Sequence, residues 1–136
     1  MLKTLIIIGF TTAVAASLTA ADKPDISKLP PAAKKTGVTY DADIKPIVEK
    51  SCVKCHGPEK PKSKYRVDSR DAIIKAGDSD EAAVLPGKSS ESPLIHYVAG
   101  LVEDMEMPPT DKRDKYPALT TEQIALLRAW IDQGAK

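Results

Sequence analysis

The ten residues "SCVKCHGPEK", positions 51–60, contain both cysteines of the chain and one of its two histidines. Cys52 and Cys55 are three positions apart, and His56 follows the second cysteine directly. Cysteine and histidine in such close spacing are typical of metal sites, redox dithiols, disulfides and cofactor attachment sites. The chemistry of this cluster therefore decides which kind of fold surrounds it.

Three interpretations leave part of the cluster unexplained. A structural zinc site could use Cys52, Cys55, His56 and His96, but the adjacent Cys55 and His56 would have difficulty reaching one tetrahedral ion. A thioredoxin-like dithiol follows a strand in a βαβ unit, whereas a helical pattern precedes this pair. A disulfide would close a very short loop and would leave His56 without a role.

The fourth interpretation uses every residue, because Cys-x-x-Cys-His is the attachment signature of c-type haem. Cys52 and Cys55 would form thioethers with the two vinyl groups of one porphyrin, and a ring nitrogen of His56 would bind the iron. The other ring nitrogen needs a partner, typically a backbone carbonyl, and the loop 57–62 is its nearest source in the sequence, although the sequence does not say which carbonyl serves. The sequence thus favours one covalently attached haem c.

The first residues have the layout of a secretory signal. Lys3 precedes an apolar run, and the small residues 19–21 offer a cleavage point before Asp22. We expect residues 1–21 to be a signal peptide and the protein to be periplasmic or otherwise exported. An uncleaved run would be a membrane tether, although it is short for a span. After cleavage no membrane span is expected.

The remaining 115 residues predict one small domain. Without Lys3 they carry 19 basic and 19 acidic residues, a balance that gives no support to a nucleic-acid partner. Residues 22–38 mix Lys, Pro and Ala without an apolar period, so we expect a flexible leader there and the domain at 39–136. We expect a monomer. Few aromatic side chains are present, and a large apolar cofactor would help to fill the core.

Apolar periodicity predicts helices throughout the domain. Ile44, Ile47 and Val48 share one face of a helix that runs into the cysteine cluster. A short helix capped by Asp68 or Ser69 is expected within 67–78, and another capped by Ser89 or Ser90 within 85–100. Thr120 and Gln123 form a capping box before an apolar stripe. No segment alternates like a strand, so the fold class is all-α, with three to five short helices and long loops.

Five blocks of the sequence follow one another in a familiar order. They are "YDADIKPIVEKSCVKCHG", "YRVDSRDAIIKAG", "LPGKSSESPLIHYV", "MEMPP" and "LTTEQIALLRAWIDQGA". In this order, over residues 38–136, they resemble the planctomycete-type cytochrome c domain family. The resemblance implies a small class I-like cytochrome c fold wrapped around one haem, with its first and last helices packed near the haem edge. It also implies Cys52 and Cys55 as thioether residues, His56 as proximal ligand and Met107 as distal ligand.

The candidates for the distal iron ligand are His96, Met105 and Met107. His96 belongs to an expected amphipathic helix, where a partly exposed histidine is usual. Spacing alone does not choose between the two methionines, which lie on the same side of an extended loop. The prolines at 108 and 109 stiffen the chain next to Met107, whereas Met105 lies among acidic residues. We therefore predict that His56 and Met107 bind the iron.

A haem iron that is bound by two protein side chains in addition to the porphyrin has no open position for a substrate. The sequence thus predicts a carrier of single electrons between redox partner proteins, not an enzyme. The alternatives are a haem-based sensor or small peroxidase with a displaceable distal ligand, and a haem-free dithiol oxidoreductase. Arg66 could meet a haem propionate, although a solvated loop charge is the favoured interpretation. Four lysines around the cluster would either attract an acidic partner or merely keep the loop soluble: Lys54, Lys60, Lys62 and Lys64.

Overall fold

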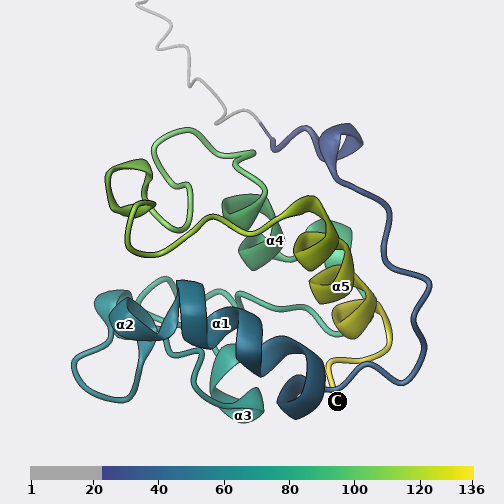
Figure 1. The fold of residues 1–136 in the computed structure, drawn as a ribbon, viewed down its shortest axis with the longest axis horizontal. Coiled ribbons are helices and arrows are strands. Elements are labelled where there is room, and N and C mark those ends of the chain that lie inside the picture. The colour runs from purple at the N-terminus through teal and green to yellow at the C-terminus, as the bar shows by residue number, and fades with distance from the viewer. Residues whose placement is uncertain (1–22) are drawn as a thin grey trace, which may run out of the picture.

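The computed structural model describes residues 23–136, so the predicted signal peptide lies outside the described residues. Within this range the chain forms helices and no strand, apart from one isolated bridge between Ala76 and Ala82. This confirms the all-α prediction. The α-helices are α1 (Lys45–Ser51), α2 (Val53–His56), α3 (Arg70–Ile73), α4 (Pro93–Val98) and α5 (Thr121–Asp132) (Figure 1). None of the helices in residues 23–136 is long and apolar enough to cross a bilayer.

A 3-10 turn, Ile26–Lys28, comes first, and a single π-helical turn, Tyr40–Ile44, later leads directly into α1. Thr39 caps the turn by accepting a hydrogen bond from the amide of Ala42 at 3.3 Å. Pro46 lies in the first turn of α1, where its missing N–H costs no hydrogen bond. The predicted face is buried, with Ile44, Ile47 and Val48 all in the core.

Helix α5 is the centre of the core. Its capping box is formed as predicted, since the amide of Gln123 donates to Thr120 Oγ1 at 3.2 Å and the amide of Thr120 donates to Gln123 Oε1 at 2.9 Å. Trp130 is fully buried, and its ring centroid lies 6.0 Å from that of Tyr40. The first and last helical segments therefore meet at this aromatic pair, and α5 also packs against α4.

The two short central helices begin differently. Ser69 caps α3 by accepting a hydrogen bond from the amide of Ala72 at 3.2 Å. Ser69 is one of the two residues that the sequence offers as the cap. Helix α4 is capped by neither Ser89 nor Ser90, because a 3-10 turn, Ser89–Glu91, precedes it. The residue before α4 is Ser92, whose hydroxyl is used within the preceding loop instead.

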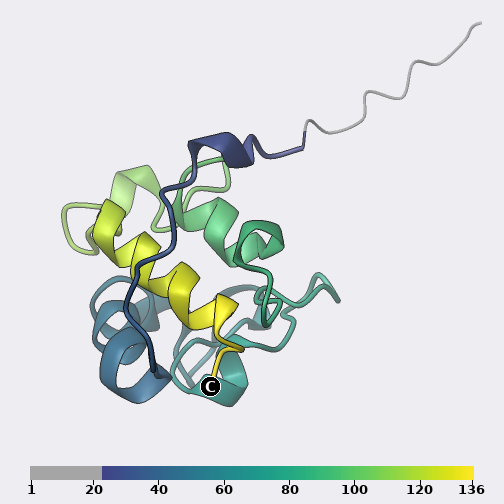
Figure 2. The same ribbon diagram turned by 90° about the vertical axis from the view of Figure 1, so that its right-hand side faces the viewer.

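The chain before the first helix lies along α5, and we call residues 29–38 the strap. Figure 2 shows it crossing in front of α5. The amide of Ala33 donates to the carbonyl of Ala125 at 2.9 Å, and the side chain of Arg128 donates to the carbonyl of Pro30. The composition of this segment predicts a flexible leader. In the structure, residues of α5 supply hydrogen-bond partners for the backbone of the strap.

The last residues return to the start of the domain. Gly134 has φ of +97°, a conformation that favours glycine, and it turns the chain after α5. The carbonyl of Lys136 then accepts from the amide of Tyr40 at 3.2 Å and from Trp130 Nε1 at 2.9 Å. The side chain of Gln133 accepts from the amide of Val38 at 3.2 Å. This tail therefore closes the domain onto the strap.

Candidate functional site

A cavity of about 390 Å³ lies between α2 and the loop that follows α4. Cys52 and His56 line it from one side, and Met105 and Met107 line it from the loop. The structure therefore brings together three of the four predicted site residues, Cys52, His56 and Met107. Apolar side chains supply much of the remaining wall: Tyr65, Val67, Leu94 and Val98.

The two cysteines lie at the junction of α1 and α2. Cys52 ends α1 and starts α2, with its amide bonded to the carbonyl of Val48 at 2.8 Å and its own carbonyl bonded to the amide of His56 at 2.9 Å. Burial, with a smaller effect of the Cys55 thiol, raises the pKa of Cys52 to about 12. Cys55 is half-buried and is not among the residues that line the cavity. The two thiols do not form a disulfide.

His56 is oriented by the backbone of Tyr65. The distance between His56 Nδ1 and the carbonyl oxygen of Tyr65 is 3.0 Å. Since a carbonyl can only accept, Nδ1 carries the proton, and Nε2 of the neutral ring keeps a free lone pair. The partner therefore lies beyond the loop 57–62, which is the nearest source of a carbonyl in the sequence. Left-handed residues at 60, 63 and 64 fold the chain back, so that a later carbonyl reaches the imidazole.

Tyr65 is a residue that the sequence reasoning missed. Its ring meets that of His56 edge to face, with a centroid distance of 5.7 Å, and its hydroxyl donates to the carbonyl of Ile73 at 2.8 Å. Burial raises the pKa of the Tyr65 hydroxyl. The available signal in the sequence was its isolation, since it is the only aromatic residue between His56 and His96.

The two methionines differ in exposure. Met105 is 44% exposed, whereas Met107 is half-buried and packs against the core. The amide of Met107 donates to the carbonyl of Tyr97 at 3.0 Å, which ties this part of the loop to α4. His96 does not line the cavity, and its Nε2 is within 2.8 Å of the carbonyl of Ser90. Both thioethers, but not the second histidine, thus share the cavity with His56.

Charged groups at the cavity are acidic. Asp78 and Glu81 line it, and no lysine or arginine does. Asp78 forms an exposed ion pair with Lys64, at 3.1 Å. The lysines of the cluster at 54, 60, 62 and 64 are all absent from the cavity wall.

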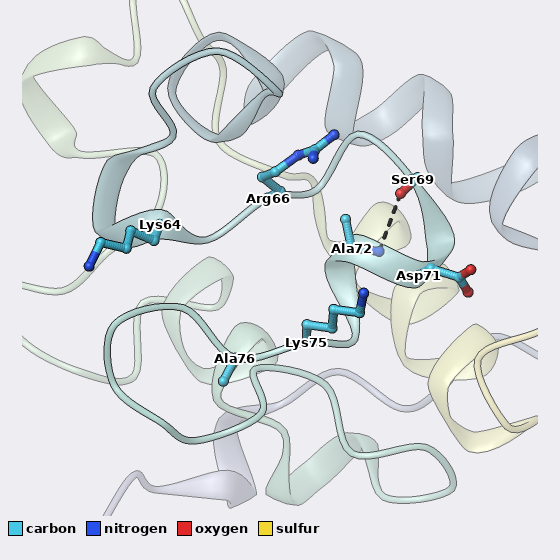
Figure 3. A pocket seen from close by; sticks show the side chains of 7 residues that line it. All are labelled: Lys64, Arg66, Ser69, Asp71, Ala72, Lys75 and Ala76. Carbon is cyan, nitrogen blue, oxygen red and sulfur yellow. Dashed lines mark hydrogen bonds between the residues drawn. The ribbon is translucent and has the colours of Figure 1, made fainter.

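Arg66 faces a separate hollow of about 210 Å³, drawn in Figure 3 with Lys64 and Lys75. The backbone at Tyr65 is extended, so the side chains on either side of it point away from the cavity. The guanidinium of Arg66 binds both oxygens of Asp68, at 2.8 and 2.7 Å. These bonds lower the pKa of Asp68 and raise that of Arg66. Arg66 is therefore an exposed, paired charge.

No group of three or more histidine, cysteine and acidic side chains in residues 23–136 is arranged to hold a metal ion. The four candidate zinc ligands are accordingly not brought together, because His96 points to Ser90. Instead the site combines an apolar cavity, a thiol, an imidazole with a free nitrogen and two thioethers. These residues fit a large, flat, apolar group that carries a metal of its own.

The family model described as Planctomycete cytochrome C matches residues 52–111 of the chain. This match confirms the family resemblance, and its residues include the cysteine pair and both methionines of the cavity. The cytochrome c family implies haem c as the cofactor and suggests an electron carrier. A search of the curated proteins and of the solved structures finds no match to the chain.

Proposed function

We propose that this chain is an exported mono-haem c-type cytochrome that carries single electrons between redox partner proteins. Cys52 and Cys55 would hold one haem by two thioethers, and His56 and Met107 would bind its iron. The observation that carries the proposal is the cavity, because Cys52, His56, Met105 and Met107 all line it. When bound, the haem supplies an iron that gains or loses one electron.

The residues of the chain have separate tasks in this function. His56 presents Nε2 to the cavity because its Nδ1 proton is held by the carbonyl of Tyr65. That hydrogen bond fixes the ring orientation and increases the basicity of Nε2. Val67, Leu94 and Val98 present apolar surface to the cavity. An apolar wall would surround the flat face of the haem and limit the access of water to it.

Met107 is proposed as distal ligand in preference to Met105. Its side chain packs against the core, and its amide is bonded to α4, so little additional order is needed for it to bind. Met105 is nearly half exposed and lies between Asp104 and Glu106. A thioether ligand at position 107 would raise the reduction potential. It would also leave no open position on the iron, so we propose a carrier and not an enzyme.

The test is expression of the full chain with its predicted signal in a host that attaches haem c. We expect the exported protein to have the mass of residues 22–136 plus one haem. Its red colour should survive denaturation, and its reduced spectrum should be that of a six-coordinate c-type haem, unchanged by carbon monoxide. Colour lost on denaturation would contradict covalent attachment. Rapid binding of carbon monoxide would favour the sensor or peroxidase alternative.

A further inference from the structure

Gly77 lies where no larger residue fits. A Cβ atom at this position would be 2.4 Å from the carbonyl oxygen of Ser63 and 2.9 Å from Cβ of Tyr65. The φ of Gly77 is outside the left-handed range, so the close approach, and not the backbone conformation, excludes a side chain. The next amide, that of Asp78, donates to the same Ser63 oxygen at 2.8 Å. The chain around Gly77 is thus pressed against residues 63–65.

Tyr65 is held from a second direction by α3. Its hydroxyl donates to the carbonyl of Ile73, the last residue of that helix. Ile73 is fully buried, so this carbonyl belongs to a fixed part of the core. Between these two restraints, the carbonyl of Tyr65 accepts the proton of His56 Nδ1. Gly77 and Ile73 therefore determine where that carbonyl lies.

We propose that Gly77 and the Tyr65 hydroxyl are positioning groups for His56, and that they tune the iron through it. This inference rests on the proposed function. A carbonyl held close to Nδ1–H makes the imidazole a stronger electron donor, which favours the oxidised iron. If the carbonyl moves away, the hydrogen bond weakens and the reduced form is favoured. The segment 63–78 thereby sets the reduction potential through the backbone carbonyl of Tyr65, which accepts from His56 Nδ1.

The test uses Gly77→Ala and Tyr65→Phe in the haem-loaded protein. Alanine at 77 must displace the backbone of residues 63–65, and phenylalanine at 65 removes only the bond to Ile73. We expect each variant to shift the equilibrium toward the reduced form, by up to about tenfold for Gly77→Ala. For one electron this is an increase of about 59 mV in potential. The Nδ1 proton of His56, followed by NMR of ¹⁵N-histidine-labelled protein, should exchange with solvent several-fold faster.

Matched controls separate positioning from stability. Gly87→Ala introduces strain at φ of +84° with nothing within 4 Å of the new Cβ, so it should lower Tm and leave both readouts unchanged. Tyr116→Phe removes a hydroxyl that makes no hydrogen bond within residues 23–136, so it should change nothing. If Gly77→Ala does not mature, Tyr65→Phe carries the test.

Two outcomes would overturn the inference, and they differ. If wild-type protein carries haem but the two variants only lose stability, with wild-type potential and proton exchange, Gly77 and Tyr65 are structural residues and the proposed function stands. If wild-type protein carries no haem, the proposed function fails and the inference fails with it.

Discussion

The two sides of the cavity are built differently. On the histidine side, the carbonyl of His56 accepts from the amide of Val67 at 2.9 Å, and its ring is bonded to Tyr65. The hydroxyl of Tyr40 in turn donates to the carbonyl of Val67. On the methionine side, Met107 is fixed by one backbone bond to Tyr97 in a long loop without an α-helix. His56 is therefore held by hydrogen bonds to its backbone and to its ring, whereas Met107 is held by one backbone bond and by the packing of its side chain against the core.

This difference indicates that hydrogen bonds orient the ring of His56, whereas the thioether of Met107 is placed by packing and by one backbone bond. A side chain that is held by hydrogen bonds loses less freedom on binding than one that is held by packing alone. We therefore expect substitutions on the two sides of the cavity to have unequal effects.

The largest effect is expected from the double variant Cys52→Ala, Cys55→Ala, which prevents covalent attachment. Without the cofactor, the apolar wall of this cavity would have no apolar partner, and a small domain has little stability to spare for such a loss. Thermal unfolding followed by circular dichroism should show no cooperative transition. A cooperative helical melt of the haem-free variant would contradict the idea that the cofactor completes the fold.

The next effect is expected on the methionine side. Met107→Ala should leave a folded, haem-containing protein, because Met107 is only partly buried against the core and the proposed thioethers of Cys52 and Cys55 remain. It should lose the sulfur-to-iron charge-transfer band, bind carbon monoxide and lower the potential by on the order of 100 mV, within the range of about 0.8 V that axial ligands span. Met105→Leu and His96→Ala are the controls. If Met105→Leu loses the band and Met107→Ala keeps it, the ligand is Met105.

A smaller effect is expected from Tyr40→Phe on the histidine side. The hydroxyl bond to Val67 is buried, so its loss should cost about 1–2 kcal/mol of unfolding free energy. Burial, followed by the charge of Asp68, raises the pKa of Tyr40 from 10.0 to about 12. Stability from this group is complete below pH 10 and is lost as pH rises toward 12. Denaturant titrations at increasing pH should show that Tyr40→Phe loses less unfolding free energy above pH 10 than the wild type does.

The smallest effect is expected from a substitution at the start of α5, which lies on neither side of the cavity. Thr120→Ala removes one half of the capping box of α5 and should cost about 1 kcal/mol. The potential and the charge-transfer band should not change, because Thr120 contacts neither ligand. Thr120→Ser, which keeps the hydroxyl, is the matched control for the denaturant midpoint. A shifted potential in Thr120→Ala would show that the core and the iron site are more tightly coupled than the comparison allows.

Local patterns predicted the helices well, because their causes are local. The capping box at Thr120 and the face of Ile44, Ile47 and Val48 depend on residues a few positions apart. The partner of His56 could not be predicted in this way, since it depends on left-handed turns between it and Tyr65. The strap was missed for a similar reason. Its composition predicts flexibility, but its order comes from Arg128 and the backbone of α5, nearly a hundred residues away.

The tail that closes the domain has a consequence for synthesis. The amide of Val38 bonds to the side chain of Gln133, 95 positions later, and the amide of Tyr40 bonds to the carbonyl of Lys136. Neither bond can form before these last residues have been made. At about 5–20 residues per second, a ribosome needs on the order of 5–20 s to make the intervening chain. During that interval the strap and Tyr40 lack these partners, and the domain stays open. Cys52 and Cys55 therefore emerge into an unfinished fold and remain accessible to chemistry that the closed domain would hinder.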